Sequence, residues 1–350
     1  MKKLGFVQTI SDPYIYVKFN NNDLFFIAVY VDELLLFSRS KSEIEQVKNL
    51  LKFEFKVTDF GEVKYFLGVH VTHDSDKGTI FLNQRAYAEN VLRRFGLSEA
   101  NSVKSPMDPN VKFLQCNDDS KLCDIVLYQS IIGSLIYLSS KTRPDIAYSV
   151  NKLARYCSKP SVDNLLAVKR VLRYVKGTLN YGLLYSKSKD NLIECVGYSD
   201  ADWAGDNDDR KSTSGYSFHM SGASISWNSS KQTCVALSTA EAEYVALSNA
   251  TQEAMWLKTL LKELNFDSCS PMTLFGDNTA AIRISNDAQC SRKTKHIDIK
   301  FNYVRDKVLS KDICLEFCKS EDMIADGLTK ALTHDKFVKF RELLGVVSIQ

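Results

Sequence analysis

The sequence has few of the residues that break a chain or cross-link it. Its 350 residues include only 6 Pro, 15 Gly and 9 Cys. No two Cys are spaced as Cys-x-x-Cys, and no cluster of Cys and His has the spacing of a zinc site, which argues against a zinc-binding module. Because the number of Cys is odd and no signal peptide is present, we expect free, mostly buried thiols in a reducing compartment.

Long apolar segments and a strong net charge are also missing. The longest apolar run, LFFIAVYV at 24–31, is far shorter than the roughly 20 residues that cross a bilayer. The net charge is +3, from 45 Lys and Arg against 42 Asp and Glu, which is too small to indicate a nucleic-acid partner by itself. These absences predict a soluble intracellular protein, cytoplasmic or nuclear, that is not secreted and has no transmembrane segment.

The length and the apolar pattern predict three regions, of which the middle one is mostly helical and basic and the other two contain both strands and helices. A chain of 350 residues is too long for one small core. Pro106, Pro109 and several Asn and Asp place a linker near 101–119. The first region, 1–110, is expected to contain strands at 24–31, 34–37, 65–72 and 79–82 and helices near 42–53 and 85–95. The second, 111–190, is expected to contain helices at 126–139, 143–156 and 162–175. The third region is 191–350.

The last region predicts a mixed five-stranded sheet with helices. Apolar alternation and helical periodicity follow one another in the order that describes a layered α/β fold. Strands are expected at 192–199, 215–221, 224–227, 272–275 and 313–318, and helices at 239–264, shortly after 277, at 296–308 and from 321 onward.

Positive charge is concentrated in the predicted helical region. Between Lys141 and Lys176 there are nine Lys and Arg but only two Asp, an excess that suits a surface facing phosphates. Lys169, Arg170 and Arg173 lie in this stretch. A solvated helix face explains the same charges equally well, so the alternative stays open.

Four separated acidic residues stand where a fold could bring them together. Asp200 ends a strand in GYSDADWAG, and Glu243 lies in the first turns of a long helix in STAEAEYVAL. Asp277 lies between a strand and a helix in TLFGDNTAAI, and Asp326 lies in the predicted final helix. Carboxylates suit Mg²⁺, which prefers oxygen ligands, and two such ions about 4 Å apart promote phosphodiester hydrolysis.

Each of these acids has a simpler alternative. Asp277 could cap the helix that follows it, and Glu243 could face solvent. Glu241 competes with Glu243, but about 200° of helix rotation separates them, so only one can point inward. Asp202 is an alternative to Asp200, because residues two apart lie on the same face of a strand. Asp322 is an alternative to Asp326, because residues four apart lie on the same face of a helix.

From Gly197 to Leu332 the sequence resembles the ribonuclease H domain of copia-type retrotransposon polyproteins. The matching blocks are GYSDADWAGDNDDRKSTSGY, SWNSSKQTCVALSTAEAEYVAL, LFGDNTAAI, KTKHIDIKFNYVRD and DMIADGLTKAL. The resemblance implies hydrolysis of the RNA strand of an RNA–DNA hybrid with two Mg²⁺, or alternatively Mn²⁺. It implies four catalytic and metal-binding acids, which match Asp200, Glu243, Asp277 and Asp326; Glu243 is preferred because Glu-Tyr-x-Ala parallels the Glu-Leu-x-Ala of related enzymes.

The upstream region resembles the same polyproteins. YQSIIGSLIYLSSKTRPDIAYSVNKLARY looks like the connection to the polymerase, and FLGVHV and VKSPMDPN look like the end of a palm and a thumb. YVDELLLFS resembles the polymerase metal-binding hairpin, usually Tyr-Val-Asp-Asp, with Asp32 kept and Glu33 in place of the second Asp. With so few residues before Asp32 for an earlier palm strand, we expect a truncated palm, a vestigial metal site and no RNA-directed DNA polymerase activity from this chain alone.

The resemblance also implies partners. An RNA–DNA hybrid is read across its wide minor groove, largely by backbone and 2′-hydroxyl contacts. A full-length reverse transcriptase chain is a further candidate partner, whereas a membrane or small-molecule cofactor is not expected. A catalytically silent nucleic-acid-binding remnant is the alternative function. Arg210 and Lys211 are candidate contacts to nucleic acid, with a solvated turn as the alternative. Lys293, Lys295 and His296 are further candidates, although His296 could instead pack inside the protein. The last candidates are Lys169, Arg170 and Arg173.

Overall fold

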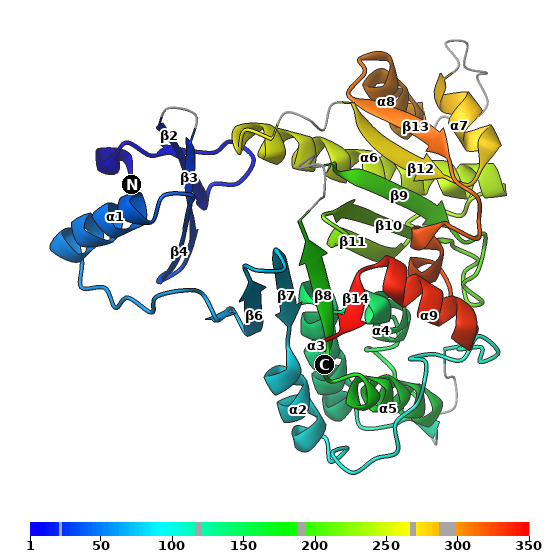
Figure 1. Cartoon of the computed structure of the whole chain (residues 1–350). Helices are drawn as coiled ribbons and strands as arrows, with labels where there is room; N and C mark the ends of the chain where they lie inside the picture. The colour runs from blue at the N-terminus through cyan, green and yellow to red at the C-terminus, as the bar shows by residue number, and fades with distance from the viewer. Residues whose placement is uncertain (21–22, 116–120, 188–193, 267–270, 287–297, 350) are drawn as a thin grey trace. The chain divides into compact units, whose positions relative to one another are not determined.

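The computed structural model describes residues 1–20, 23–115, 121–187, 194–266, 271–286 and 298–349 (Figure 1). The chain divides into two compact units. One comprises Met1–Lys64 and Glu253–Ser270, and the other comprises Tyr65–Gln252 and Pro271–Gln350. In the part of the chain described, no helix is both long and apolar enough to cross a membrane.

The first unit contains a four-stranded antiparallel sheet, of order β1-β2-β3-β4, and helix α1. Its elements are η1 (Lys2–Leu4), β1 (Val7–Gln8), β2 (Ile15–Asn20), β3 (Asp23–Tyr30), β4 (Glu33–Ser38) and α1 (Lys41–Glu54). Phe25 and Ile27 of β3 are buried in one cluster with Val47 and Leu51 of α1. This apolar contact between sheet and helix forms the core of the unit.

The hairpin predicted between the apolar runs is present, but its turn is one residue earlier than expected. Tyr30 pairs with Glu33, so the two-residue turn is Val31-Asp32, and Glu33 already belongs to β4. Val31 has a φ of 53°, which suits the turn geometry that joins two twisted antiparallel strands. Asp32 therefore lies in the turn, whereas Glu33 begins a strand.

The second unit contains the mixed five-stranded sheet that the last part of the sequence predicts. Its order is β11-β10-β9-β12-β13; β9, β10 and β11 are antiparallel, and β12 is parallel to both β9 and β13. The elements of this part of the chain are β9 (Val196–Ala201), β10 (Thr213–Met220), β11 (Ala223–Lys231), α6 (Thr239–Glu263), β12 (Met272–Gly276), α7 (Thr279–Asn286), α8 (Asp298–Leu309) and β13 (Ile313–Phe317). Helix α6 belongs to the second unit as far as Gln252. β9 and β12 are central, so their carboxyl ends lie beside each other in the middle of the sheet.

A second five-stranded sheet, of order β14-β8-β7-β6-β5, is wholly antiparallel. Its strands are β5 (Tyr65–Phe66), β6 (Val69–Asp74), β7 (Thr79–Asn83), β8 (Tyr181–Ser186) and β14 (Val346–Ser348). The sheet thus takes strands from each of the three regions predicted at 1–110, 111–190 and 191–350. Those boundaries remain a prediction, but the sheet shows that the regions are joined by backbone pairing.

The helical region shares its core with the end of the chain. Its helices are α2 (Arg85–Arg94), α3 (Ile125–Lys141), η3 (Pro144–Ile146), α4 (Ala147–Ala154) and α5 (Val162–Gly177). Helices α3, α4 and α5 pack together (Figure 1). One buried apolar cluster runs from these helices to Leu328 and Phe340 in the last part of the chain. The ring of Tyr174 on α5 packs edge-on against Phe337, with 5.4 Å between the centroids.

The continuous final helix expected from residue 321 is wrong. The segment forms a short 3₁₀ helix, η5 (Ile324–Leu328), and a separate helix, α9 (His334–Leu343). The helix η5 is closely packed on both sides. A Cβ on Gly215 of β10 would lie 2.8 Å from Leu328 Cβ, and one on Gly327 would lie 2.6 Å from the ring of Phe340. Glycine at both positions lets η5 pack closely against β10 and α9.

Candidate functional site

Asp200 is placed by the central strand of the mixed sheet. It lies next to the last residue of β9, opposite Gly215 of β10, and only 4% of it is exposed. The Thr329 hydroxyl, from the residue after η5, lies 2.7 Å from Asp200 Oδ2. The carboxylate is therefore held at the carboxyl end of β9, beneath η5.

Glu243 lies in the first turns of α6, and its rival Glu241 has a different task. Glu241 Oε2 accepts a hydrogen bond from the backbone N–H of Leu237 at 2.8 Å, while the Ser238 hydroxyl accepts one from the Glu241 N–H. This reciprocal arrangement satisfies the free N–H groups at the helix start. The Glu243 carboxylate points instead toward Asp200 and the backbone N–H of Ala201.

Asp277 follows β12 directly and does not cap the next helix. The neighbouring Asn278 does so, because its Oδ1 accepts hydrogen bonds from the N–H groups of Ala280 and Ala281, each at 3.0 Å. Asp277 Oδ2 accepts one from the Ser320 hydroxyl at 2.7 Å. Asn278, and not Asp277, therefore caps the helix that follows.

The three acids meet. One carboxylate oxygen each from Asp200, Glu243 and Asp277 lies within 4.8 Å of the others, the only such group of His, Cys, Asp or Glu among the residues described. Oxygens that share an octahedral Mg²⁺ at about 2.1 Å are roughly 3 Å apart in cis and 4.2 Å in trans. Small side-chain rotations would bring these oxygens to that geometry, and an all-oxygen donor set is what Mg²⁺ prefers.

The electrostatics of the cluster favour a cation. Burial raises the pKa of Glu243 to about 10, and the charges of Asp200 and Asp277 add to the shift. Burial also raises the pKa of Asp200 to about 7, assisted by the negative charge of Asp326 and opposed by the Thr329 hydroxyl. Carboxylates so crowded either keep protons or bind a positive ion.

Asp326 lies in the same neighbourhood but outside the group of three. Its carboxylate is paired with the ammonium of Lys330, four residues along. Its rival Asp322 is exposed and pairs with Lys339 of α9 at 3.0 Å. Thr329 and Lys330 were not singled out from the sequence; their spacing of three and four residues after Asp326 is the signal that could have found them.

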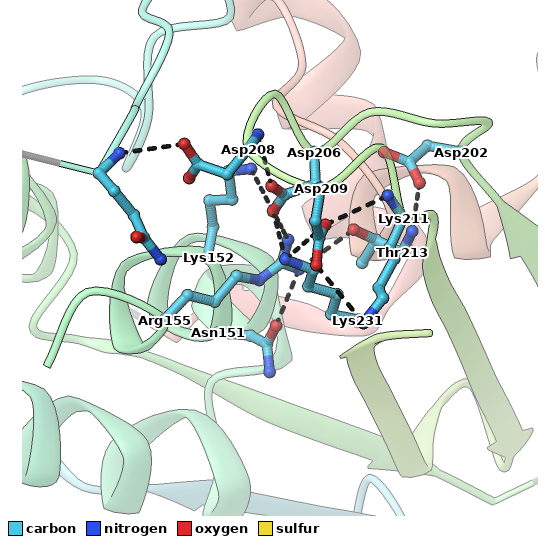
Figure 2. Close-up of polar contacts among 11 residues, drawn as sticks. Asn151, Lys152, Arg155, Asp202, Asp206, Asp208, Asp209, Lys211, Thr213 and Lys231 are labelled. Atoms are coloured by element: carbon cyan, nitrogen blue, oxygen red, sulfur yellow. Dashed lines mark hydrogen bonds and ion pairs between the residues drawn. The ribbon is translucent and has the colours of Figure 1, made fainter. Parts of the chain in front are cut away.

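Asp202, the rival of Asp200, points elsewhere. Its backbone N–H donates to the Thr213 carbonyl at 3.1 Å, and its carboxylate accepts the Thr213 N–H (Figure 2). Burial raises the pKa of Asp202 to about 6, while the Thr213 N–H and Arg155 oppose the shift. Asp202 is therefore part of the loop between β9 and β10 and does not belong to the acid group.

Of the residues predicted to bind nucleic acid, Arg210 and Lys211 lie in this same loop. Arg210 is exposed, with a φ of 58°, and its N–H donates to the carbonyl of Asp206 at 3.0 Å. The Lys211 ammonium lies 3.5 Å from the carboxylate of Asp209. Lys293, Lys295 and His296 lie outside the described residues.

The basic helical region is less available to a ligand than its sequence suggests. Arg170 donates to the Ser105 hydroxyl at 3.2 Å, and Arg173 donates to the Asn101 carbonyl at 2.6 Å. Arg143 is buried and paired with Asp145 at 2.8 Å. Lys169 is half-buried on α5. The predicted excess of positive charge is therefore partly used inside the fold, because Asp145 pairs with Arg143, and Arg170 and Arg173 donate hydrogen bonds to groups of the chain itself.

Asp32 and Glu33, the predicted vestigial polymerase site, are both exposed. Among the residues that the structure describes, neither belongs to a group of three or more metal-binding side chains. Asp32 lies in the turn of the hairpin, and Glu33 is the first residue of β4.

The chain matches known proteins along its length. A family model described as reverse transcriptase (RNA-dependent DNA polymerase) matches residues 1–109. The chain is 35% identical, over 99% of its length, to the retrovirus-related Pol polyprotein from transposon TNT 1-94 of Nicotiana tabacum. It is 34% identical, over 72% of its length, to a protein attributed to transposon Ty5-1 of Saccharomyces cerevisiae, of which it covers 81%. A solved foamy viral protease-reverse transcriptase in complex with RNA/DNA hybrid is similar over 84% of this chain and 36% of that chain, with 13% identity and a TM-score of 0.46.

The mixed sheet and its acids define an α/β protein with a cluster of three carboxylates at the end of a central strand. More particularly, the chain belongs to the family of copia-type retrotransposon Pol polyproteins. It is a reverse transcriptase-like region of such a polyprotein, and it spans 26% of the length of the tobacco relative.

Proposed function

We propose that the acid group is the active site of a ribonuclease H, which hydrolyses the RNA strand of RNA–DNA hybrids. The observation that carries the proposal is the meeting of Asp200, Glu243 and Asp277 within 4.8 Å, from a strand, a helix and a strand end. Membership of the copia-type family supports it, because the family resemblance assigns an acidic site to these positions. No polymerase activity is proposed for this chain.

The residues divide the work as follows. Asp200, Glu243 and Asp277 would hold the ions, with Asp326 as a fourth ligand. Two divalent ions, Mg²⁺ or Mn²⁺, would supply an activated water and stabilise the leaving oxygen. The chain itself orients the ligands: the hydroxyl of Thr329 lies 2.7 Å from Asp200, and that of Ser320 lies 2.7 Å from Asp277.

The proposed substrate is recognised through its backbone. A hybrid presents 2′-hydroxyls on one strand across a wide minor groove, so base sequence matters little. Arg210 is exposed and Lys211 half-exposed in the β9–β10 loop, and both are proposed to contact phosphates. Lys293, Lys295, His296 and Lys169 are proposed as further contacts, together with the remaining N–H groups of Arg170 and Arg173. Binding through phosphates predicts that affinity falls steeply with salt.

The test uses the whole purified chain and RNA labelled at its 5′ end. With Mg²⁺, we expect cleavage of the RNA when it is paired with DNA, and none when it is paired with RNA. Asp277→Asn should abolish cleavage because it removes a ligand charge. Asp322→Asn is the matched control, since Asp322 is an exposed acid that pairs with Lys339.

The outcomes separate the two candidate functions. Cleavage that survives Asp277→Asn, or its loss in Asp322→Asn alone, would contradict the assignment of the site. A hybrid that is shifted on a gel but never cut would favour the catalytically silent nucleic-acid-binding protein.

A further inference from the structure

A buried carboxylate outside the acid group gathers three cations. Asp206, in the loop between β9 and β10, is only 1% exposed. Its Oδ2 lies 2.9 Å from Arg155, 3.1 Å from Lys231 and 3.3 Å from Lys152 (Figure 2). Its Oδ1 accepts a hydrogen bond from the N–H of Asp208 at 3.0 Å.

The cations come from elements that are separate in the sequence. Lys152 lies in α4, Arg155 follows it, and Lys231 ends β11. Asp206 therefore fastens its own loop both to α4 and to the edge strand of the mixed sheet. Burial works to raise the pKa of Asp206, but the Asp208 N–H and the three cations together hold it well below its usual range. The carboxylate therefore stays ionised at any ordinary pH, whereas burial and the charge of Arg155 lower the pKa of Lys152.

Arg155 carries the connection from Asp206 to the start of β10. One guanidinium nitrogen, Nη1, donates to Asp206, and the other, Nη2, donates to Thr213 Oγ1 and Asn151 Oδ1, each at 3.1 Å (Figure 2). The backbone of Thr213 exchanges hydrogen bonds with Asp202, directly after β9. Two residues further along the same ladder, Gly215 lies opposite Asp200.

We propose that Asp206 is a positioning residue for the acid group: through Arg155 and Thr213 it fixes the carboxyl end of β9, and thereby the direction of the Asp200 carboxylate. The proposal rests on the proposed function in one respect, that the acid group binds divalent ions. The proposal implies that α4, through Lys152 and the adjacent Arg155, helps to position the acid group.

The first variant removes the charge of Asp206. The full chain is titrated with Mn²⁺ by calorimetry, and Asp206→Asn is expected to weaken binding about tenfold, the cost typical of an outer residue that orients a ligand. Asp208→Asn is the matched control, because Asp208 is an exposed acid of the same loop whose carboxylate accepts a hydrogen bond from the Gln115 N–H. The control should bind Mn²⁺ as the wild type does.

The second variant separates positioning from folding. Arg155→Lys keeps a positive charge beside Asp206 but loses the planar fork that also reaches Thr213. We expect its thermal unfolding midpoint to stay close to that of the wild type, and its affinity for Mn²⁺ to fall several-fold. Asp206→Asn, by contrast, leaves three cations without their anion, and its midpoint should fall by about 10 °C.

Each result decides between the two proposals. A wild-type chain that binds no Mn²⁺ would overturn the ion site and, with it, the positioning role. If the wild type binds and both variants bind equally well, the ion site stands, Asp206 serves folding alone, and the positioning role is overturned.

Discussion

The Thr329 hydroxyl lies 2.7 Å from Oδ2 of Asp200, although 129 positions separate the two residues. The same hydroxyl lies 2.9 Å from the carbonyl oxygen of Asp326. One side chain therefore connects the central strand to the short helix that carries the fourth acid. Asp326 consequently lies near the acid group because η5 packs against β9 and β10.

Replacing Thr329 with Val should weaken ion binding while leaving the shape of the residue unchanged. The hydroxyl holds down the pKa of Asp200, so its loss favours the protonated acid, which competes with a metal ion. We expect the dissociation constant for Mn²⁺ to rise about tenfold. Thr333→Val is the control, because Thr333 is exposed and its hydroxyl does not cap α9. Equal affinities in the two variants would contradict the role of the Thr329 hydroxyl.

Glu243→Gln should lower hybrid cleavage at least about 100-fold, the upper end of the cost of disturbing a metal site. Glu241→Gln makes the same replacement of a carboxylate by an amide on the same helix. It affects the hydrogen bond between Glu241 and the N–H of Leu237. An amide oxygen still accepts that hydrogen bond, so cleavage should persist. The measurement is the initial rate on a labelled hybrid at saturating Mg²⁺. Loss of activity in the Glu241 variant alone would reverse the assignment of the two residues.

The metal-free protein should gain stability from Asp200→Asn, and the gain should depend on pH. The folded pKa of Asp200 is raised to about 7, so between pH 4 and 7 the folded chain keeps a proton that the unfolded chain has lost. Its contribution to stability therefore falls as pH rises, by at most about 1.4 kcal/mol per unit. His219, whose pKa burial lowers to about 4, changes with the opposite sign, so the wild type and variant must be compared at each pH.

Urea unfolding in EDTA from pH 5 to 8 measures that difference. The advantage of the Asn variant should grow up to about pH 7 and then level off. Saturating Mg²⁺ should reverse it, because the ion binds only the carboxylate form. A variant that is less stable than the wild type in EDTA at pH 8 would contradict the proposed crowding of charges.

Gly215→Ala should destabilise the second unit by about 1–3 kcal/mol, because its Cβ would press against Leu328 and force η5 away from the sheet. Gly133→Ala on α3 is the matched control, since nothing lies within 4 Å of a Cβ there. It should raise stability by about 0.5–1 kcal/mol, the usual gain of Ala over Gly in a helix. Chemical unfolding measures both, and a shared direction of change would contradict the close packing.

The mixed α/β fold could be predicted because its strands and helices are long and periodic, and the structure confirms that fold class. The strands β8 and β14 were not predicted. The three residues of β14, Val346–Ser348, carry no alternation and pair with β8. The helix expected around Asp326 is wrong for a related reason. Packing against Gly215, more than a hundred residues earlier in the sequence, decides its length.

The acid group shows what sequence reasoning can and cannot supply. Periodicity placed Asp200, Glu243 and Asp277 at strand ends and on a helix, and the resemblance to copia-type polyproteins selected them over their rivals. The structure brings these three together. The basic stretch left a phosphate-facing surface and a solvated helix face as equal alternatives, because the sequence gives no sign that Lys152 and Arg155 meet Asp206. Charge pairs between distant segments depend on the tertiary fold, so composition alone overstates the free positive charge.

The pairing of β14 with β8 has a consequence for synthesis on the ribosome. β8 emerges far earlier than β14, so one edge of its sheet stays uncovered while most of the second unit is being made. Uncovered strand edges recruit other chains, and nascent proteins with such edges depend on chaperones. A ribosome stalled before Val346 would therefore release a chain prone to aggregate, even though all the acids had already been synthesised.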